Sequence, residues 1–366
     1  MTVDNIAIVL YDLSVAGGIQ RMSMQMAKIL AENGYNVDLI TFFLRKDSLN
    51  ALYRAIEGAP RNLRILKPLN LPKAAPVTLA SYLIRLLHRK LKNYELIINA
   101  HGDVQPIIAN IVYFHQFNVD YNFHAGTMQR RVMLLPLWWI RKEFIEDLRN
   151  SDAWILVNST WTYAEARRFW DFGNVSILYP PVPVEKLKDL ARIPRKENCV
   201  VTISRLSPDR GIKNVFELAK EFPSVKFIIA GHVQDARYFS YLLTTKPDNV
   251  SLYPNITEDF KVRLFKKAKV YLNLTPYVEG FGIAVAEAMA AGLIPITKNM
   301  GGVIDFVPKE YRFNDLVEAK RIMMMALKEW SIEKSVSLSN IVVRFSLSNF
   351  RRHLLEIVNA AISKRV

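Results

Sequence analysis

The sequence has 366 residues, of which 51% are hydrophobic, so it is long enough for two domains and too apolar to be disordered. Its single cysteine, Cys199, excludes an intramolecular disulfide and fits a reducing compartment, and the net charge is +15. No window reaches the roughly 18 apolar residues of a membrane span, and residues 1–18 lack the basic start of a signal peptide.

Short apolar runs alternate with amphipathic stretches in the first half of the chain. A helix is predicted at 19–34, where Gly34 closes it. Buried strands are predicted at 5–11, 36–43, 96–100, 110–115 and 153–158. Such alternation is typical of a parallel sheet that is covered by helices on both faces.

Three prolines in "YPPVPV", residues 179–184, interrupt the pattern, because proline neither continues a helix nor fits a central strand. Afterwards the alternation restarts, with strands predicted at 199–205, 225–231, 268–274 and 293–297. Residues 346–365 read as an amphipathic helix with Ser346 or Ser348 as its N-cap. We therefore predict an α/β protein with two Rossmann-like, doubly wound parallel-sheet domains facing across a cleft, joined near residue 180.

Ligands of such sheets bind at the carboxyl ends of the strands, so the residues that follow each strand are the candidates for a site. Gly17 and Gly18 follow the first strand and precede a helix, which favours an anion or simply a tight turn. After the strand at 199–205, the cations Arg205, Arg210 and Lys213 have the chemistry to clamp a diphosphate. The alternative is a solvated loop.

The segment "VEGFGIAVAEAMAAG", 278–292, combines glycines with a carboxylate inside an apolar helix. Gly280 and Gly282 allow a ligand to approach the backbone, and the helix N-terminus suits a phosphate. A buried carboxylate needs a hydrogen-bonding partner, so Glu287 either accepts from a sugar diol or forms a structural ion pair with a lysine or arginine.

Two histidines end neighbouring strands of the first domain. His115 follows the strand at 110–115, and His101 follows the strand at 96–100. Both are candidates for a ligand site, and the alternative for each is a histidine whose ring is satisfied by the backbone.

Together these segments resemble retaining glycosyltransferases of family 4, which have the GT-B fold. "EGFGIAVAEAMAAG" resembles the family's Glu-x7-Glu motif, with Glu279 and Glu287 at the right spacing. "ISRLSPDRGI" resembles its "GRLxPEKG" segment, "LSVAGGIQR" its N-terminal glycine loop, and "YPPV" its interdomain linker. The resemblance implies an acceptor domain at 1–180, a nucleotide-sugar domain at 181–345, and a C-terminal helix, 346–366, that packs back on the first domain.

The resemblance also implies roles for individual residues. Four residues are assigned to catalysis. His115 would lie near the reacting sugar, Glu279 would contact the transferred sugar, and Arg205 and Arg210 would contact the diphosphate. Arg210 stands where the family has lysine, so Lys213 is the alternative second cation. Donor binding is assigned to Gly17, Gly18, Lys213, Gly280, Phe281, Gly282, Ile283 and Glu287, and acceptor binding to His101 and Gln116.

No Asp-x-Asp motif occurs in the sequence, so we expect the arginines and a helix N-terminus to stabilise the leaving diphosphate without a metal ion or other cofactor. This interpretation fails if Glu287 is paired with a basic side chain while Arg205 points into bulk water. The rivals are a soluble family member acting on a water-soluble saccharide, a GT-B sugar-nucleotide epimerase, and a non-catalytic basic binding protein.

Two basic, apolar segments, 77–93 and 130–142, have the composition of membrane-interface helices or of ordinary core-facing ones. A narrower resemblance, to dolichol-pathway α-1,2-mannosyltransferases, rests on "VYFHQFN" and the Glu-x7-Glu segment. It implies transfer of a hexose, mannose or glucose, to a lipid-linked glycan or glycolipid. We therefore expect a cytoplasmic protein bound peripherally to the inner face of an anionic membrane, with no nucleic-acid partner.

Overall fold

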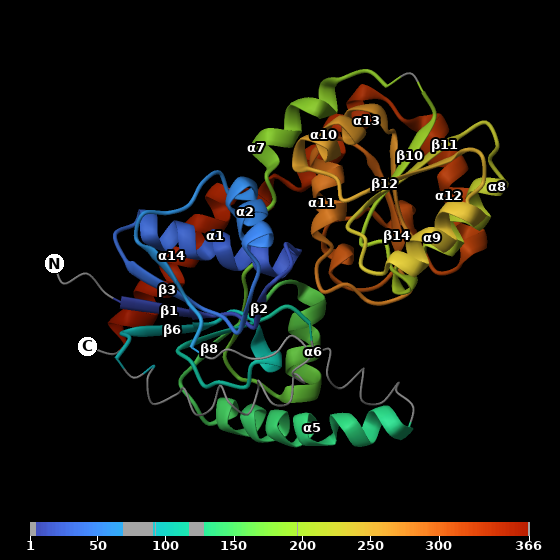
Figure 1. Cartoon of the computed structure of the whole chain (residues 1–366). Helices are drawn as coiled ribbons and strands as arrows, with labels where there is room; N and C mark the ends of the chain where they lie inside the picture. The colour runs from blue at the N-terminus through green and yellow to red at the C-terminus, as the bar shows by residue number, and fades with distance from the viewer. Residues whose placement is uncertain (1–4, 69–90, 92, 117–127, 196, 365–366) are drawn as a thin grey trace. The chain divides into compact units, whose positions relative to one another are not determined.

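The computed structural model describes residues 5–68, 91, 93–116, 128–195 and 197–364. Contacts divide the chain into two compact units, which we call unit 1 (Met1–Pro180 with Phe350–Val366) and unit 2 (Pro181–Asn349). Each unit is built on one main parallel sheet (Figure 1). Within the described part of the chain, no helix is both long enough and apolar enough to cross a bilayer.

Unit 1 contains a seven-stranded parallel sheet of order β5-β3-β1-β6-β7-β8-β9, and β2 pairs with β4 beside it. The strands are β1 (Asn5–Val9), β2 (Asp12–Leu13), β3 (Asn36–Ile40), β4 (Phe43–Leu44), β5 (Leu63–Leu66), β6 (Leu96–Asn99), β7 (Ile111–Phe114), β8 (Trp154–Val157) and β9 (Val175–Ile177). Most residues of β1, β6 and β7 are fully buried, because helices cover both faces of the sheet.

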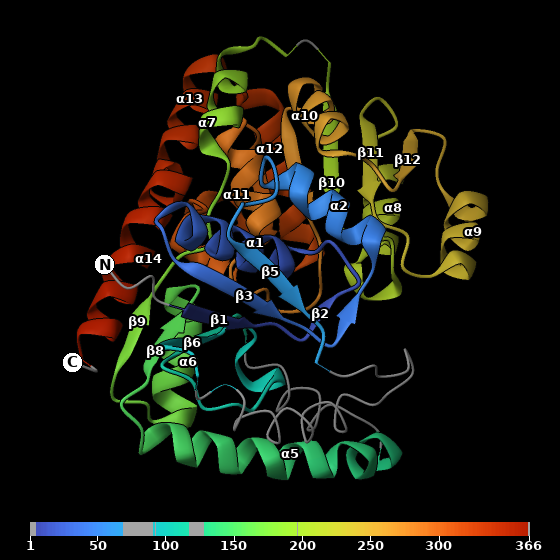
Figure 2. The same ribbon diagram turned by 60° about the vertical axis from the view of Figure 1, so that its left-hand side comes forward.

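Helices pack on both faces of the unit 1 sheet (Figures 1 and 2). On one face lie α1 (Gly18–Glu32) and α2 (Lys46–Ala55), and on the other α5 (Met128–Arg149), whose Phe144 and Leu148 belong to the same buried cluster as Ala7 and Val9. Among the described residues, this unit also contains the helices α6 (Thr160–Trp170) and α14 (Leu347–Ser363).

The C-terminal helix α14 lies beside α1 (Figure 2). Arg351 Nη1 lies 3.2 Å from Glu32 Oε2, and Tyr35 donates to Asn359 Oδ1 at 2.8 Å. Ser346 Oγ accepts from the Asn349 backbone N–H at 3.3 Å, so Ser346 caps the helix as one of the two predicted residues.

Unit 2 contains a six-stranded parallel sheet of order β12-β11-β10-β13-β14-β15. The strands are β10 (Cys199–Ile203), β11 (Lys226–Gly231), β12 (Val250–Pro254), β13 (Val270–Asn273), β14 (Ile294–Lys298) and β15 (Arg312–Phe313). The helices are α7 (Val184–Leu187), α8 (Ile212–Lys220), α9 (Ala236–Thr245), α10 (Glu258–Lys267), α11 (Ile283–Ala290), α12 (Leu316–Glu329) and α13 (Ile332–Ile341).

Both sheets follow the strand order of a Rossmann-type, doubly wound domain, so the predicted fold class is confirmed. In each sheet the chain starts at a central strand, β1 or β10, builds outward to one side, and then returns to build outward on the other. The point of return lies between β1 and β6 in unit 1 and between β10 and β13 in unit 2. Ligands of doubly wound sheets bind at this switch point, beyond the carboxyl ends of the strands.

Candidate functional site

The switch point of unit 2 brings together two segments that are about 70 residues apart in the sequence. Strand β10 pairs with β13 through Val200 and Val270, so the residues that follow the two strands emerge at the same edge. Arg205 follows β10, and Glu279 lies on the loop after β13. The two predicted segments therefore meet because parallel strands present their carboxyl ends on one side of a sheet.

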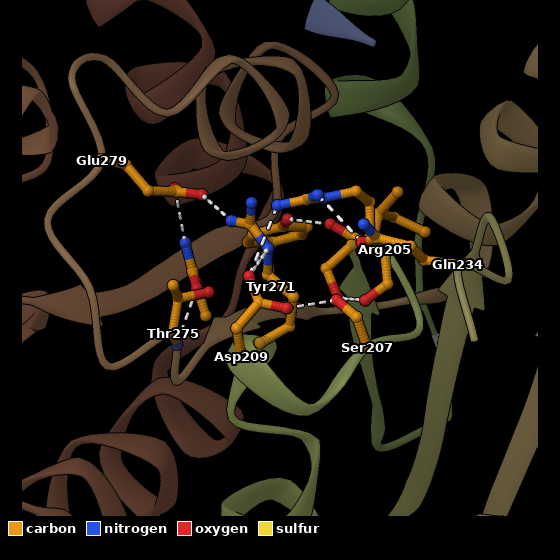
Figure 3. Close-up of polar contacts among 11 residues, drawn as sticks. Arg205, Ser207, Asp209, Gln234, Tyr271, Thr275 and Glu279 are labelled. Atoms are coloured by element: carbon orange, nitrogen blue, oxygen red, sulfur yellow. Dashed lines mark hydrogen bonds and ion pairs between the residues drawn. The ribbon is translucent and has the colours of Figure 1, made fainter. Parts of the chain in front are cut away.

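The first half of the site is centred on Arg205 and Asp209 (Figure 3). Arg205 donates through Nη1 to Gln234 Oε1 at 2.9 Å, and its Nη2 lies 3.4 Å from Asp209 Oδ2. The other oxygen of Asp209 accepts from Ser207 Oγ at 2.5 Å. These contacts hold the guanidinium in place while 45% of the Arg205 side chain stays exposed, so it is accessible to a ligand.

The second half of the site holds the carboxylate of Glu279 between two partners (Figure 3). Arg210 Nη1 lies 3.2 Å from Glu279 Oε1, and Asn273 Nδ2 donates to Glu279 Oε2 at 3.0 Å. Asn273 is itself oriented, because its Oδ1 accepts from the Thr275 backbone N–H at 3.0 Å. The last side chain of β13 thereby sets the direction of Glu279.

The two arginines repel each other. Burial lowers the pKa of Arg205 below its ordinary value, and the neighbouring Arg210 cation lowers it further, while Asp209 and Glu279 act in the opposite direction. Asp209 lies between the pair, with its Oδ2 3.4 Å from Arg205 Nη2 and 3.3 Å from Arg210 Nε. A bound diphosphate would relieve the repulsion that remains, and the planar fork of arginine matches its oxygens.

Lys213 does not belong to this cluster. Its Nζ lies 4.7 Å from the ring centre of Tyr241 on α9, and the side chain is exposed on α8. The second cation beside Glu279 is Arg210, and donor binding by Lys213 stays a prediction. Lys213 comes two residues into α8, beyond the turn at Gly211 that ends the arginine loop.

The predicted glycine segment opens α11, with Gly282 as its N-cap in a left-handed conformation, φ +89°. Ile283 is the first residue of the helix and is partly exposed, and Gly280 is buried against Gly302. Phe281 requires a correction. Its ring lies 5.1 Å from Phe306 and 5.0 Å from Phe345 and is almost fully buried, so it packs in an aromatic cluster and its side chain offers nothing to a ligand.

Glu287 has the structural partner that the sequence left open. Its Oε2 lies 2.7 Å from Lys261 Nζ on α10, and the two side chains are only 3% and 8% exposed. Of the two partners that were possible from the sequence, a sugar diol or a basic side chain, the structure shows the basic side chain, and a buried charge needs such a partner also before a ligand binds. Arg205 does not point into bulk water, because it contacts Gln234 and Asp209. The two conditions that together would exclude the enzyme interpretation are therefore not both met. A ribose contact by Glu287 stays a prediction.

Unit 1 presents the remaining predicted residues at its own switch point. Gly17 is the N-cap of α1 and Gly18 its first residue. A Cβ on Gly17 would lie 2.8 Å from Gln20 Oε1, and Gln20 donates to the carbonyl oxygen of Asp12 at 3.1 Å. The glycine thus lets the helix start close to the end of β2.

The two histidines of unit 1 form one cluster. Their ring centroids are 6.3 Å apart, the ring of His115 lies 4.7 Å from that of Tyr113, and His115 Nε2 is 3.0 Å from the Ala100 carbonyl oxygen. Since that carbonyl can only accept, Nε2 carries the proton and Nδ1 is the acceptor. Burial lowers the pKa of His115 to about 4 and that of His101 to about 3, so both rings are neutral at pH 7. Gln116 follows His115 and is partly buried.

We expect unit 1 to lose stability as the pH falls through this window. The unfolded chain binds protons on both histidines near pH 6.5, whereas the folded unit resists protonation down to about pH 4 and 3. Between pH 6.5 and 5 the free energy of unfolding should therefore drop by up to about 1.4 kcal/mol per pH unit for each histidine. Denaturant titrations at several pH values measure this slope.

The matched variants separate this effect from other titrations. His115→Asn and His101→Asn should each reduce the slope by roughly the share of one histidine. An unchanged slope in His115→Asn would contradict the buried, neutral state of that ring.

Several side chains in these contacts were not anticipated from the sequence, among them Asp209, Gln234, Asn273 and Lys261. Two of them left a signal. Asn273 ends an otherwise apolar strand, and Lys261 occupies the apolar face of α10, at spacings of three and four from the buried Leu264 and Phe265. A polar residue at such a position needs a partner, and that requirement marks it for attention.

Fold and geometry together define an α/β protein of two Rossmann-type units, one of which carries a pair of arginines beside a carboxylate at its switch point. Two family models match the chain, "Glycosyltransferase Family 4" over residues 16–186 and "Glycosyl transferases group 1" over residues 184–328. The chain belongs to the glycosyltransferases of family 4, with the GT-B fold.

The relatives agree with this assignment. The GDP-Man:Man(3)GlcNAc(2)-PP-Dol alpha-1,2-mannosyltransferase of Dictyostelium discoideum is 27% identical over 282 residues, which are 68% of this chain and 55% of that protein. The chain thus spans about half the length of this curated relative. Sucrose-phosphate synthase from Thermosynechococcus elongatus has a TM-score of 0.76 at 18% identity, over 99% of this chain and 100% of that one. HepE of Anabaena, in complex with UDP-glucose, has a TM-score of 0.69 at 14% identity, over 98% and 100%.

Proposed function

We propose that this chain transfers a hexose from a nucleoside-diphosphate sugar to an acceptor, with retention of anomeric configuration and without a metal ion. The observation that carries the proposal is the arrangement in which Arg205 and Arg210 flank Asp209 at the switch point of unit 2, with Arg210 3.2 Å from Glu279. Negative charge that develops on a leaving diphosphate needs fixed positive groups at this position.

Each residue of the cluster has a distinct task in this proposal. Arg205 and Arg210 bind the diphosphate and stabilise the charge that it gains as the bond to the sugar breaks. Glu279, held by Arg210 and Asn273, accepts hydrogen bonds from hydroxyls of the transferred sugar. The acceptor hydroxyl attacks on the face from which the diphosphate leaves, and a phosphate oxygen takes its proton.

The proposed donor is GDP-mannose. Its support is the printed name of the Dictyostelium relative, a GDP-Man-dependent enzyme that matches 68% of this chain. The structural neighbour HepE was crystallised with UDP-glucose, so that donor is the direct competitor in any test. Hexoses differ at single hydroxyl groups, and a site built to hydrogen-bond those hydroxyls discriminates between them strongly.

A lipid-linked glycan at an anionic membrane surface is the proposed acceptor. The relative's name includes a dolichol-linked substrate. On α5, Leu135 and Trp139 lie one turn apart and are 43% and 59% exposed, and Lys142 Nζ lies 5.9 Å from the Trp139 ring. Exposed tryptophan beside lysine suits a membrane interface. Of the second candidate segment, 77–93, all but residues 91 and 93 lies outside the described residues.

The proposal is tested by one transfer assay. The protein is incubated with GDP-mannose or UDP-glucose and either a polyprenyl-diphosphate-linked glycan in anionic vesicles or soluble saccharides, each with and without EDTA. We expect labelled mannose in the organic phase, an unchanged rate with EDTA, and faster transfer from vesicles at low salt.

Other outcomes point to the rivals. A water-soluble product identifies a soluble-saccharide enzyme, and a changed donor sugar without any acceptor identifies an epimerase. A rate abolished by EDTA and restored by Mg²⁺ would contradict metal independence. If no donor is consumed in any combination, the proposed transferase activity fails.

A further inference from the structure

The lysine that pairs with Glu287 lies in an unusual place for its type. Lys261 is on the core-facing side of α10, where its neighbours Leu264 and Phe265 are buried, and only 6% of the residue is exposed. A buried ammonium group costs free energy unless charged partners surround it. A hydrophobic residue would fill this position on α10 at lower cost, so the lysine needs another explanation.

Lys261 bridges two carboxylates from different helices. Its Nζ lies 2.7 Å from Glu287 Oε2 on α11 and 2.8 Å from Glu258 Oε2 at the start of α10. Glu258 is half exposed, whereas Glu287 is buried, so the ammonium links an inner carboxylate to one at the surface. These contacts restrict Nζ, and through it the rotamer of Glu287.

We infer that Lys261 is a positioning residue that holds the Glu287 carboxylate, ionised and in one orientation, for the ribose hydroxyls of the nucleotide. This inference rests on the proposed function. A carboxylate has about four acceptor positions, so pairing with Lys261 is compatible with accepting hydrogen bonds from ribose hydroxyls as well. The ion pair with Lys261 offsets the cost of burying this carboxylate before a ligand arrives.

The inference predicts a coupling between Lys261 and the ribose. A nucleotide that lacks the 2′ and 3′ hydroxyls cannot use Glu287, so its affinity should not depend on Lys261. An intact nucleotide should lose affinity when the lysine is replaced. If the ion pair were purely structural, replacing Lys261 would instead lower the stability of the protein, or weaken the binding of both nucleotides equally.

Isothermal titration of GDP against 2′,3′-dideoxy-GDP, and of UDP against its dideoxy analogue, measures this coupling. We expect the wild-type protein to prefer the intact nucleotide of its donor by about tenfold or more, because each unmade hydrogen bond to a charged group is costly. In Lys261→Met the preference should fall to within about twofold. In Lys261→Arg, which keeps the charge but changes the geometry, it should be intermediate.

A matched control makes the result decisive. Lys266→Met removes an exposed lysine of the same helix and should retain the wild-type preference. If Lys261→Met does not fold, Lys261→Arg decides the question, because a fully retained preference in that variant overturns the inference. A folded Lys261→Met with the wild-type preference also overturns it.

The two proposals fail in different ways. If the wild-type protein binds GDP or UDP but shows no preference for an intact ribose, the positioning role of Lys261 fails while the transferase proposal stands. If it binds no nucleoside diphosphate and transfers no sugar, the proposed function fails first.

Discussion

Replacing Arg210 by alanine is expected to lower kcat/KM for sugar transfer by about 10²–10³-fold, the usual loss when one fixed group that stabilises transition-state charge is removed. Arg210 makes the 3.2 Å contact with Glu279 Oε1, and its Nε lies 3.3 Å from Asp209. Its removal therefore deletes a positive charge at the proposed leaving group and leaves Glu279 with Asn273 as the partner on its other oxygen. Steady-state kinetics at varied donor concentration measure the effect.

The loss should appear in kcat and, to a smaller extent, in KM, because Arg210 binds the diphosphate of the donor and interacts more strongly with the charge that develops during bond cleavage. Arg210→Lys should recover part of the rate, since lysine restores the charge but not the two-pronged geometry. The matched control is Arg321→Ala on α12, an exposed arginine 3.8 Å from Glu318, which should keep the wild-type rate. A near-normal rate in Arg210→Ala would remove this residue from the proposed machinery.

The Gly211→Ala variant should lose about 3 kcal/mol of folding free energy from unit 2 and most of the transfer activity. Gly211 has φ +68°, a left-handed conformation that alanine disfavours. A Cβ at this position would lie 2.1 Å from the carbonyl oxygen of Leu274, which is backbone and cannot yield. The loop that carries Arg205 and Arg210 would have to move away from β13. Chemical denaturation and the transfer assay measure the two effects.

Two other glycines serve as graded controls for this effect. Gly34 has φ +92°, but a Cβ there would meet nothing within 4 Å, so Gly34→Ala isolates the cost of backbone strain. Gly173 has open space and no left-handed φ, so Gly173→Ala should be close to neutral. A Gly211→Ala protein no less stable than Gly34→Ala would show that the loop can shift without cost.

The fold class was predictable from the local pattern of apolar residues, because buried parallel strands are short apolar runs that differ clearly from amphipathic helices. The run at 199–205 became β10, and the run at 225–231 became β11. The short edge strands β5 and β9 were missed, since partly exposed residues in them break the apolar pattern. The spacing between Glu279 and Glu287 suggested the family together with the arginine segment, the N-terminal glycine loop and the proline linker.

The candidate site was predictable only as a set of segments. Arg205, Arg210 and Glu279 each follow a strand, and the rule that ligands bind at the carboxyl ends of strands places them at one edge. Which of these side chains contact one another could not be predicted from the sequence. The contact between Arg210 and Glu279 joins residues 69 positions apart, and nothing local distinguishes Arg210 from Lys213 as the cation beside that carboxylate.

By itself, the sequence determined the two-domain α/β architecture and the residues that lie near the switch points, because the alternation of strands and helices follows from local apolar patterning. Only the tertiary structure showed three side-chain contacts. Phe281 packs in an aromatic cluster, Lys213 lies beside the ring of Tyr241, and Lys261 pairs with Glu287. Side-chain partners of this kind come from different elements. Which of them meet depends on how helices pack against the sheet, and a pattern along the chain does not encode those distances.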